Sequence, residues 1–342
     1  MEKVDILIIH LNGEKIIDEC LSSIYSNNKD ASIHVLFNNT QDNSINLVNS
    51  KFPKVKKHFT KKTIGFAEAS NILAKKASSR YIVFLNNDVI VERNWLSEML
   101  STIKSNKKCI AVQPKIKSYF QRDCFEYAGA AGGFMDKYGY PFCRGRIFNS
   151  IEKDNKQYDD SVRIFWACGV CILANRDFFI KSKGFDESLF MYAEELDFCW
   201  KANIFGKEIL YSPKSVIYHI GSFSVNTEKV NFKKEYLITR NHLLVFLKNY
   251  SILNIIKLLP IRIILEIISA IRFPTKKALP LAACLFSLPV ILIKDFSKKR
   301  KFVQSNRKVS DEEYSNLIYN RSIALDYFLK GKKRFSDLLL NN

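Results

Sequence analysis

The sequence predicts an α/β fold in which a mostly parallel sheet is covered by helices. Two observations carry this prediction: short apolar runs typical of buried strands alternate with segments of helical spacing, and polar residues directly follow the strand-like runs. Such alternation is typical of parallel sheets, because parallel strands need a crossover, which is usually a helix. The chain has 342 residues, 47% of them hydrophobic, which is enough for a full-sized core.

The predicted elements alternate through the first hundred residues. Strand-like runs cover residues 5–9 (DILII), 33–37 (IHVLF) and 81–85 (YIVFL). Helical spacing of apolar residues covers residues 14–25, 65–77 and 95–103. Ligands of such sheets bind beyond the carboxyl ends of the strands. Three strand ends are therefore candidate binding positions: residues 10–12, 38–39 and 86–88.

Composition divides the chain in two. Residues 110–225 are less regular, and past about residue 245 the chain becomes rich in Ile, Leu and Lys. We therefore expect one domain over residues 1–245 and a helical region over 246–342. The N-terminal apolar run covers only residues 6–9, which does not fit a signal peptide, so we expect a cytosolic chain with reduced thiols. Cys168 and Cys171 form a C-x-x-C without a second pair, which favours buried structural thiols over a zinc site.

The net charge of +19 is concentrated near the C-terminus. Residues 246–342 contain 18 Lys and Arg against 7 Asp and Glu. A basic surface attracts nucleic acid or anionic lipid. Single-stranded nucleic acid would require bases to stack on exposed aromatic side chains beside the cations. This region is rich in Ile and Leu instead, so we expect an anionic membrane surface as the partner, and no nucleic acid.

The apolar part of this region predicts amphipathic helices lying in the membrane interface. Its longest charge-free run, residues 278–293, has 16 residues and contains Pro280 and Pro289, whereas a spanning helix needs about 20. The basic residues 298–301 would assist binding. A buried helical pair and a transmembrane hairpin are the alternatives. Ser310 and Glu313 have capping-box spacing, which predicts the start of a final helix.

Three groups of residues have the chemistry of a catalytic site. Asp88, after Asn86 and Asn87, ends a strand and could hold Mg²⁺ or Mn²⁺, although Asn-Asn-Asp is also common in turns. Glu194, Glu195 and Asp197 lie within four residues, among aromatic neighbours. Mutual repulsion would raise at least one of their pKa values, as suits a general base; a solvated helix flank is the alternative. His219 ends a strand-like run and is either structural or a metal ligand.

The order of these segments resembles family-2 bacterial glycosyltransferases, especially the rhamnosyltransferase-like branch. The resemblance covers roughly residues 4–225 and continues weakly through Arg240 and Asn241 into the tail. The segments that carry it, in chain order, are ILIIHLNG with CLSSI, NNTQDNS, IGFAEASN, LNND, GFDE, YAEELDFCWK and VIYHIG.

The resemblance implies a GT-A fold, which has a Rossmann-like central sheet flanked by helices, a nucleotide-sugar donor, a divalent metal (Mg²⁺ or Mn²⁺) and inversion at the anomeric carbon. Asp88 and His219 would bind the metal, and Glu195 occupies the place of the catalytic base, with Glu194 as the alternative. Trp166, Glu194 and Asp197 would contact the acceptor. Donor contacts would come from His10, Asn12, Asn38, Gly65, Asn71, Asn86 and Asn87.

Two positions depart from the family pattern. Phe37 stands where members commonly carry an Asp that meets the nucleotide base, and His10 with Leu11 replaces a usual Asn-Trp pair. Asn38 or a backbone carbonyl would have to substitute for the Asp, so the base of the donor stays open.

We therefore expect a peripheral enzyme at the cytoplasmic side of the cell membrane. It would move a sugar from dTDP-rhamnose or a UDP-sugar to a glycan acceptor, such as one on polyprenyl diphosphate, in the synthesis of cell-surface polysaccharide. The alternative is a catalytically impaired GT-A-like protein that acts as a membrane-bound assembly partner.

Overall fold

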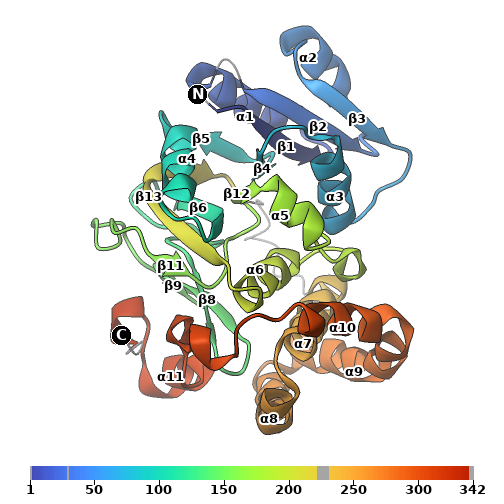
Figure 1. The fold of residues 1–342 in the computed structure, drawn as a ribbon, viewed down its shortest axis with the longest axis vertical. Coiled ribbons are helices and arrows are strands. Elements are labelled where there is room, and N and C mark those ends of the chain that lie inside the picture. The colour runs from blue at the N-terminus through green and yellow to red at the C-terminus, as the bar shows by residue number, and fades with distance from the viewer. Residues whose placement is uncertain (1, 29–30, 222–230, 339–342) are drawn as a thin grey trace.

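A nine-stranded mixed sheet forms the centre of the computed structural model, which describes residues 2–28, 31–221 and 231–338 (Figure 1). Its strands are β1 (Val4–His10), β2 (Ser32–Asn38), β3 (Lys56–Thr60), β4 (Tyr81–Asn86), β5 (Val89–Val91), β6 (Cys109–Ser118), β11 (Arg163–Ile164), β12 (Cys171–Asn175) and β13 (Glu208–His219). Their order is β11-β13-β6-β12-β4-β1-β2-β3, with β5 paired to β13.

The sheet is parallel in two blocks. Strands β3, β2, β1 and β4 form one parallel block, and β6 with β13 forms the other. Strand β12 separates the blocks and runs antiparallel to both neighbours. The predicted α/β fold with a mostly parallel sheet is thus confirmed, and the antiparallel pairs of β12, β5 and β11 make the sheet mixed.

Helices α1 to α6 accompany the strands, and three of them match the helices that apolar spacing predicts over residues 14–25, 65–77 and 95–103. They are α1 (Glu14–Asn27), α2 (Ser44–Lys51), α3 (Phe66–Lys76), α4 (Trp95–Ser105), α5 (Arg176–Lys181) and α6 (Glu194–Ile204). Helix α1, for example, buries Ile17, Cys20, Leu21 and Ile24, which recur at helical spacing. The core is continuous from β1 to the C-terminal helices.

A second sheet is built from the irregular middle of the chain. Its strands are β7 (Gly133–Asp136), β8 (Pro141–Cys143), β9 (Arg146–Ile147), β10 (Ser150–Ile151) and, from the far C-terminus, β14 (Ile318–Tyr319). Their order is β10-β9-β8-β7-β14. Gly145 connects β8 to β9 with a φ of 94°, which favours glycine. The pairing of β14 with β7 ties the C-terminal region to the middle of the chain.

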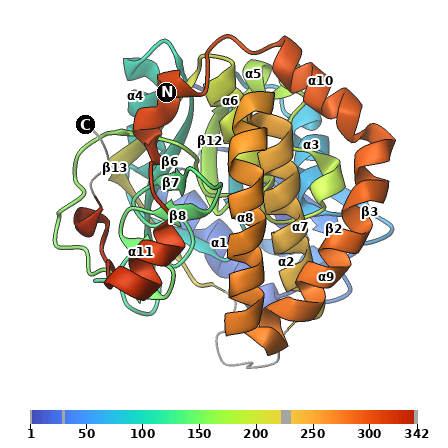
Figure 2. The same ribbon diagram turned by 90° about the horizontal axis from the view of Figure 1, so that it is seen from below.

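Four helices cover one side of the molecule (Figure 2): α7 (Phe232–Asn249), α8 (Ile252–Arg272), α9 (Pro274–Ile291) and α10 (Ser297–Ser305). A π-helical segment, Leu292–Phe296, joins the last two. Helix α8 buries Ile255, Leu265 and an ion pair of Arg262 with Glu266, and most of its other apolar side chains are exposed. In the described ranges, no helix is long and apolar enough to cross a membrane.

The predicted helix from residue 310 is wrong. A 3₁₀ segment (Glu312–Leu317), strand β14 and helix α11 (Ile323–Lys330) occupy this stretch. Glu313 does accept from the Ser310 N–H at 2.8 Å, but Tyr314, with a φ of −117°, turns into the core and interrupts the helix. The side chain of Ser322 caps α11 instead, by accepting from Leu325 N–H.

Candidate active site

The loops after β1 and β2 are bound together by their own side chains. The Asn12 side chain accepts from Gln41 N–H at 2.9 Å, and the Asp42 carboxylate accepts from Gly13 N–H at 2.6 Å. Burial acts against the Asp42 charge, but the backbone and hydroxyl donors around it lower the pKa of this carboxyl. The carboxyl ends of the first two strands are therefore preorganised.

Asn38 holds the chain that leads into α3. Its amide donates to Ile64 O at 2.9 Å and accepts from Ile64 N–H at 3.0 Å. Phe37, just before it, is buried and stacks on Phe59 with ring centroids 5.5 Å apart. The ring of Phe37 thus belongs to the core, and the Asn38 amide is already paired within the protein.

His10 is fully buried at the end of β1. Its Nδ1 lies 2.8 Å from the Asn87 amide nitrogen, which donates to it. Burial lowers the His10 pKa to about 4, so the ring is neutral at neutral pH. With Nδ1 accepting, the proton resides on Nε2, a buried donor without a protein partner among the described residues. His10 can therefore offer an N–H to an oxygen of a ligand.

Asp88 and His219 lie together, although 130 residues separate them in the chain. His219 Nε2 is 3.2 Å from Asp88 Oδ1, and Nδ1 is 3.6 Å from Glu126 Oε1. Burial acts to lower the His219 pKa, but hydrogen bonds and charge from the two carboxylates outweigh it and raise the pKa to about 9. Strand pairing fixes this meeting, because His219 of β13 lies opposite Val89 of β5, and Ile220 N–H donates to Asp88 O.

The Asp88–His219 pair fits two adjacent ligands of one metal ion. Ligands at about 2.1 Å in octahedral geometry are separated by about 3 Å, close to the observed 3.2 Å. Within the described ranges, no group of three His, Cys, Asp or Glu side chains has the arrangement of a complete metal site. Remaining ligands would have to come from a bound molecule or water.

Glu195 stands near the same strand end, in the first turn of α6. Its carboxyl lies beside Gly169, where an added Cβ would be 3.7 Å from Glu195 Cδ. The next residue, Val170, accepts from Asn86 N–H at 3.0 Å. Gly169 and Val170 thus connect Glu195 to the end of β4, which is followed directly by the Asn87-Asp88 turn.

Glu194 and Glu195 each have a buried Oε2 without a hydrogen-bond partner in the described chain. Burial raises the pKa of Glu195, and burial followed by the Glu195 charge raises the pKa of Glu194 well above its usual range. Burial, not repulsion by Asp197, is therefore the main cause of the shift at Glu195. A carboxyl with a raised pKa is suited to exchange a proton near neutral pH.

Backbone strain precedes α6. Phe190, Tyr192 and Ala193 have positive φ values of 64°, 71° and 70°, which cost non-glycine residues free energy. Asn241 on α7 holds this segment: its amide donates to Leu189 O, Met191 O and Tyr192 O, each at 2.8 Å. The Arg240 side chain donates to the Asn241 side-chain oxygen and to Ser188 O and Leu189 O.

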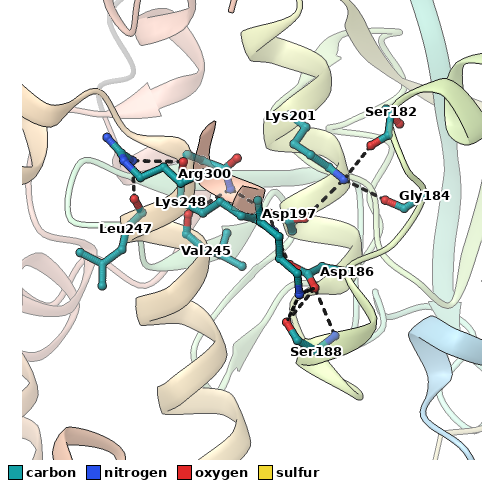
Figure 3. Close-up of polar contacts among 12 residues, drawn as sticks. Ser182, Gly184, Asp186, Ser188, Asp197, Lys201, Val245, Leu247, Lys248 and Arg300 are labelled. Carbon is teal, nitrogen blue, oxygen red and sulfur yellow. Dashed lines mark hydrogen bonds and ion pairs between the residues drawn. The ribbon is translucent and has the colours of Figure 1, made fainter. Parts of the chain in front are cut away.

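A buried ion network lies beneath α6 (Figure 3). Lys248 Nζ is 2.5 Å from Asp186 and 2.9 Å from Asp197, and Lys201 Nζ is 3.6 Å from Asp197. Asp197 is fully buried and also accepts from Asn249. Figure 3 shows Lys248 crossing between α7 and the two aspartates. This placement turns Asp197 toward lysines and away from solvent, and its contact with an acceptor stays a prediction.

Three other predicted residues have neighbours within the protein. The Asn71 amide donates to Phe185 O and to Glu187, each at 2.9 Å, and so holds the 184–187 turn. A Cβ on Gly65 would lie 2.5 Å from Phe190 O, which accounts for its glycine. Trp166 is 9% exposed, donates from Nε1 to Phe134 O, and covers Gly133. Ligand contacts of these residues stay predictions.

Sequence reasoning missed two groups that shape the site. Glu126, the carboxylate on the far side of His219, comes from an irregular stretch without a motif. Asn241 was noticed only as part of a weak Arg-Asn likeness, and the sequence gives no sign that its amide binds three carbonyls 49 to 52 residues earlier.

Comparisons with known proteins agree with this geometry. The chain is 24% identical to the rhamnosyltransferase WbbL of Escherichia coli over 156 residues, covering 44% of this chain and 58% of that protein. It is 27% identical to N-acetylgalactosaminyltransferase 6 of Drosophila melanogaster over 165 residues, covering 48% and 24%. The chain thus spans less than two thirds of either relative.

Two solved structures share the fold. GalNAc-T7 with UDP, GalNAc and Mn²⁺ superposes with a TM-score of 0.66 at 15% identity, covering 95% of this chain and 57% of that chain. The mannosyltransferase PcManGT of Pyrobaculum calidifontis, in complex with GDP-Man and Mn²⁺, gives a TM-score of 0.52 at 13% identity, covering 89% and 85%. These likenesses show an α/β GT-A fold.

The model of Glycosyl transferase family 2 matches residues 5–179, about half of the chain, from β1 through the strand end with Asp88 and into α5. The chain therefore belongs to Glycosyl transferase family 2.

Proposed function

We propose that this protein transfers a sugar from a nucleoside-diphosphate donor to a glycan hydroxyl, with inversion at the anomeric carbon. The observation that carries the proposal is one strand end with two kinds of group: the Asp88–His219 pair, and Glu195 joined to it through Gly169 and Val170. The first suits a diphosphate with its cation, and the second suits a hydroxyl that must lose a proton.

The donor would lie across the ends of β1, β2 and β4. Asp88 and His219 would hold Mg²⁺ or Mn²⁺, which supplies positive charge for the diphosphate leaving group. His10 Nε2 is a buried donor at this edge and could bind a donor oxygen. dTDP-rhamnose is the leading candidate and UDP-sugars follow; the likeness to a rhamnosyltransferase supports this order.

The acceptor hydroxyl would attack the anomeric carbon from the face opposite the diphosphate. As the new carbon–oxygen bond forms, the bond to the diphosphate breaks and the nucleoside diphosphate leaves with the electron pair. Glu195 would take the hydroxyl proton. Its raised pKa supports this role, because proton transfer is most efficient when the pKa of the base is near the working pH.

Donor binding tests this function. We expect a panel of nucleotide sugars with Mn²⁺ to raise the melting temperature for at least one donor, because a ligand that binds only the folded state stabilises it. Asp88→Asn and His219→Ala should each weaken this shift, and EDTA should abolish the difference. The double variant should lose little more than the worse single variant, since the two side chains act as a unit. Full transfer in EDTA would remove the metal role.

We further propose that the protein works at the cytoplasmic side of the cell membrane on a glycan linked to polyprenyl diphosphate, for cell-surface polysaccharide. Helices α8 and α9 expose many large apolar side chains, among them Ile271 at 74% and Phe286 at 90%. The two helices lie side by side on one side of the molecule (Figure 2). Exposed apolar area with nearby cations is typical of helices that lie in a membrane interface.

Two of the basic residues 298–301, which we expected to contact lipid, contact other parts of the protein instead. Lys299 pairs with Asp186, and Arg300 donates to Lys248 O and Tyr250 O, whereas Lys298 and Lys301 are exposed. We expect sedimentation with anionic liposomes that falls as salt rises. The double variant Ile271→Ser with Phe286→Ser should bind much less, and Ile151→Ser, on the small sheet, should bind normally. Equal binding by all three would contradict the membrane proposal.

A further inference from the structure

Arg146 at the start of β9 carries a charge that no described residue neutralises. Its Nε and Nη1 are buried and have no hydrogen-bond partner, and no described carboxylate lies within 4.0 Å. Tyr127 stacks on the guanidinium, with the ring centroid 3.7 Å from Cζ. Buried polar atoms are almost always paired in proteins, so unpaired guanidinium nitrogens indicate a missing acceptor.

Arg144, two residues earlier, is a buried arginine whose guanidinium has hydrogen-bond partners within the protein. It is 5% exposed, and its Nη1 makes hydrogen bonds to both carboxylate oxygens of Asp160 at 2.9 and 3.1 Å. Its Nε donates to Ala131 O. Arg144 therefore has hydrogen-bond acceptors within the protein, whereas the Nε and Nη1 of Arg146 could still donate to an acceptor on a ligand.

Strand pairing places Arg146 in one row with the predicted acceptor residue. Arg146 pairs with Cys143, Cys143 pairs with Gly133, and Gly133 is bridged to Trp166. Directly paired residues present their side chains on the same face of a sheet. The Trp166 ring fills the space above Gly133, where a Cβ would lie 2.3 Å from the ring. Trp166 and Arg146 thus flank the small Cys143 on one face.

This face adjoins the proposed base. Burial raises the pKa of the Cys143 and Cys168 thiols, and among the smaller effects on both pKa values the Glu195 charge raises them and the Arg146 charge lowers them. Gly169, whose Cβ position is 3.7 Å from the Glu195 carboxyl, follows Cys168 directly. Arg146 therefore lies on the Glu195 side of the site, on an element that carries neither Asp88 nor His219.

We propose that Arg146, held by Tyr127, binds an oxyanion of the acceptor and so selects an anionic acceptor. The proposal rests on the proposed transfer reaction, because Glu195 defines the acceptor side. A guanidinium binds phosphate or carboxylate oxygens through paired N–H donors, and the stacked ring fixes its plane. The oxyanion can come from a lipid diphosphate or from an acidic sugar.

Matched probes distinguish these sources. We would measure equilibrium binding of dodecyl-diphosphate-linked GlcNAc, dodecyl β-GlcNAc glycoside, methyl glucuronide and methyl glucoside, each with saturating UDP and Mn²⁺ so that the diphosphate site is filled. Wild-type protein should prefer one anionic probe over its neutral match by about 10-fold to 100-fold, the usual range for a charge-assisted hydrogen bond. A preference for the diphosphate-linked GlcNAc over the dodecyl glycoside would indicate a lipid diphosphate as the natural oxyanion. A preference for methyl glucuronide over methyl glucoside would indicate an acidic sugar.

Arg146→Gln should remove this preference, and Arg146→Lys should keep part of it. Arg80→Gln is the control, because the exposed Arg80 lies over the ring of Tyr81, with Cζ 5.3 Å from the ring centroid, at the end of β4 opposite to Asp88. Equal binding of charged and neutral probes by wild-type protein, or an unchanged preference in Arg146→Gln, would overturn the proposal. Weakened UDP binding in Arg146→Gln would assign the guanidinium to the donor and also overturn it.

Metal-dependent donor hydrolysis without acceptor separates this inference from the proposed function. Wild-type protein and the control variant Arg80→Gln should hydrolyse the donor alike. Absence of both donor binding and hydrolysis in wild-type protein would contradict the proposed function, whereas the probe preference would still be measurable.

Discussion

The first turn of α6 and the underside of the same helix carry carboxylates with opposite surroundings. Glu194 and Glu195 have no cation within 4.0 Å among the described residues, and burial raises both pKa values. Asp197, two or three residues later, is paired with Lys201 and Lys248. Paired charges of this kind hold a fold together, whereas an unpaired buried carboxyl is a poised proton acceptor. In α6, the carboxylate that pairs with lysines is thus suited to stabilise the fold, and the carboxyls without a cation are suited to exchange a proton.

The largest effect on stability should come from removing Lys248, a cation of the buried ion network beneath α6. Lys248→Met leaves Asp186 and Asp197 with an incompletely compensated buried charge, which should reduce the free energy of unfolding by about 3–5 kcal/mol. Urea unfolding measures it. Lys301→Met, at an exposed position of α10, should stay within about 0.5 kcal/mol of wild type. A loss below about 1 kcal/mol in Lys248→Met would show that the network contributes little.

Removing the unpaired carboxylate should affect turnover instead. Glu195→Gln keeps the shape and loses the proton acceptor, so kcat should fall by a factor of about 10² or more. Donor affinity should be nearly unchanged, and the unfolding free energy should not fall, because the buried Glu195 carboxyl pairs with no cation. Glu194→Gln should act more mildly and mainly on the acceptor KM. An inactive Glu194→Gln beside an active Glu195→Gln would exchange the two roles.

Asn241 connects the two regions, because it holds the strained residues before α6 from α7. Asn241→Ala frees three carbonyls and should cost about 1–3 kcal/mol of unfolding free energy. We also expect a lower kcat with little change in donor affinity, because Asn241 positions Glu195 without touching the donor side. Asn241→Asp should not rescue it, since a carboxylate cannot donate to carbonyls. An exposed control, Asn320→Ala, should match wild type in both assays.

The pH dependence of stability should have opposite slopes for the two regions. The pKa of Glu194 is raised in the folded state, so the folded protein holds the proton more tightly than the unfolded chain does. The contribution of Glu194 to the free energy of unfolding therefore falls as pH rises above about 4.3. Glu194→Gln should remove that decline, worth about 1.4 kcal/mol for each unit of pKa shift.

At Asp186 burial opposes the charge, but Lys248 and Lys299 prevail and lower the pKa. Its contribution should be present above about pH 4 and lost below it. Asp186→Asn should therefore lose stability chiefly at neutral pH. Unfolding curves from about pH 2 to pH 8 measure both variants, because the Asp186 contribution changes below about pH 4 and the Glu194 contribution above it; parallel slopes would contradict the contrast.

The sequence was sufficient for strands β1, β2 and β4 and for the polar residues at their ends, because apolar runs and the polar residues after them are local signals. The Asp88–His219 pair came from motif order, and the structure brings the two within 3.2 Å. The ion pair of Asp197 with Lys248 could not be predicted, because the two residues lie 51 positions apart and no local pattern links them; the contact of Asp197 with an acceptor stays a prediction. The strained backbone before α6 could not be predicted from the sequence, because Phe190, Tyr192 and Ala193 are not residues that favour positive φ.

Helix α7 has a practical consequence for how the chain can be divided. It runs from Phe232 to Asn249 across residue 245, carries Asn241 on one side of that boundary and Lys248 on the other, and continues into the apolar helices. Arg300 of α10 in turn binds the last carbonyls around Lys248. Deleting residues 246–342 would thus remove part of the support of α6 along with the exposed apolar side chains of α8 and α9. The C-terminal helices share one continuous core with the sheet, so the proposed lipid binding is better tested by point substitutions than by truncation.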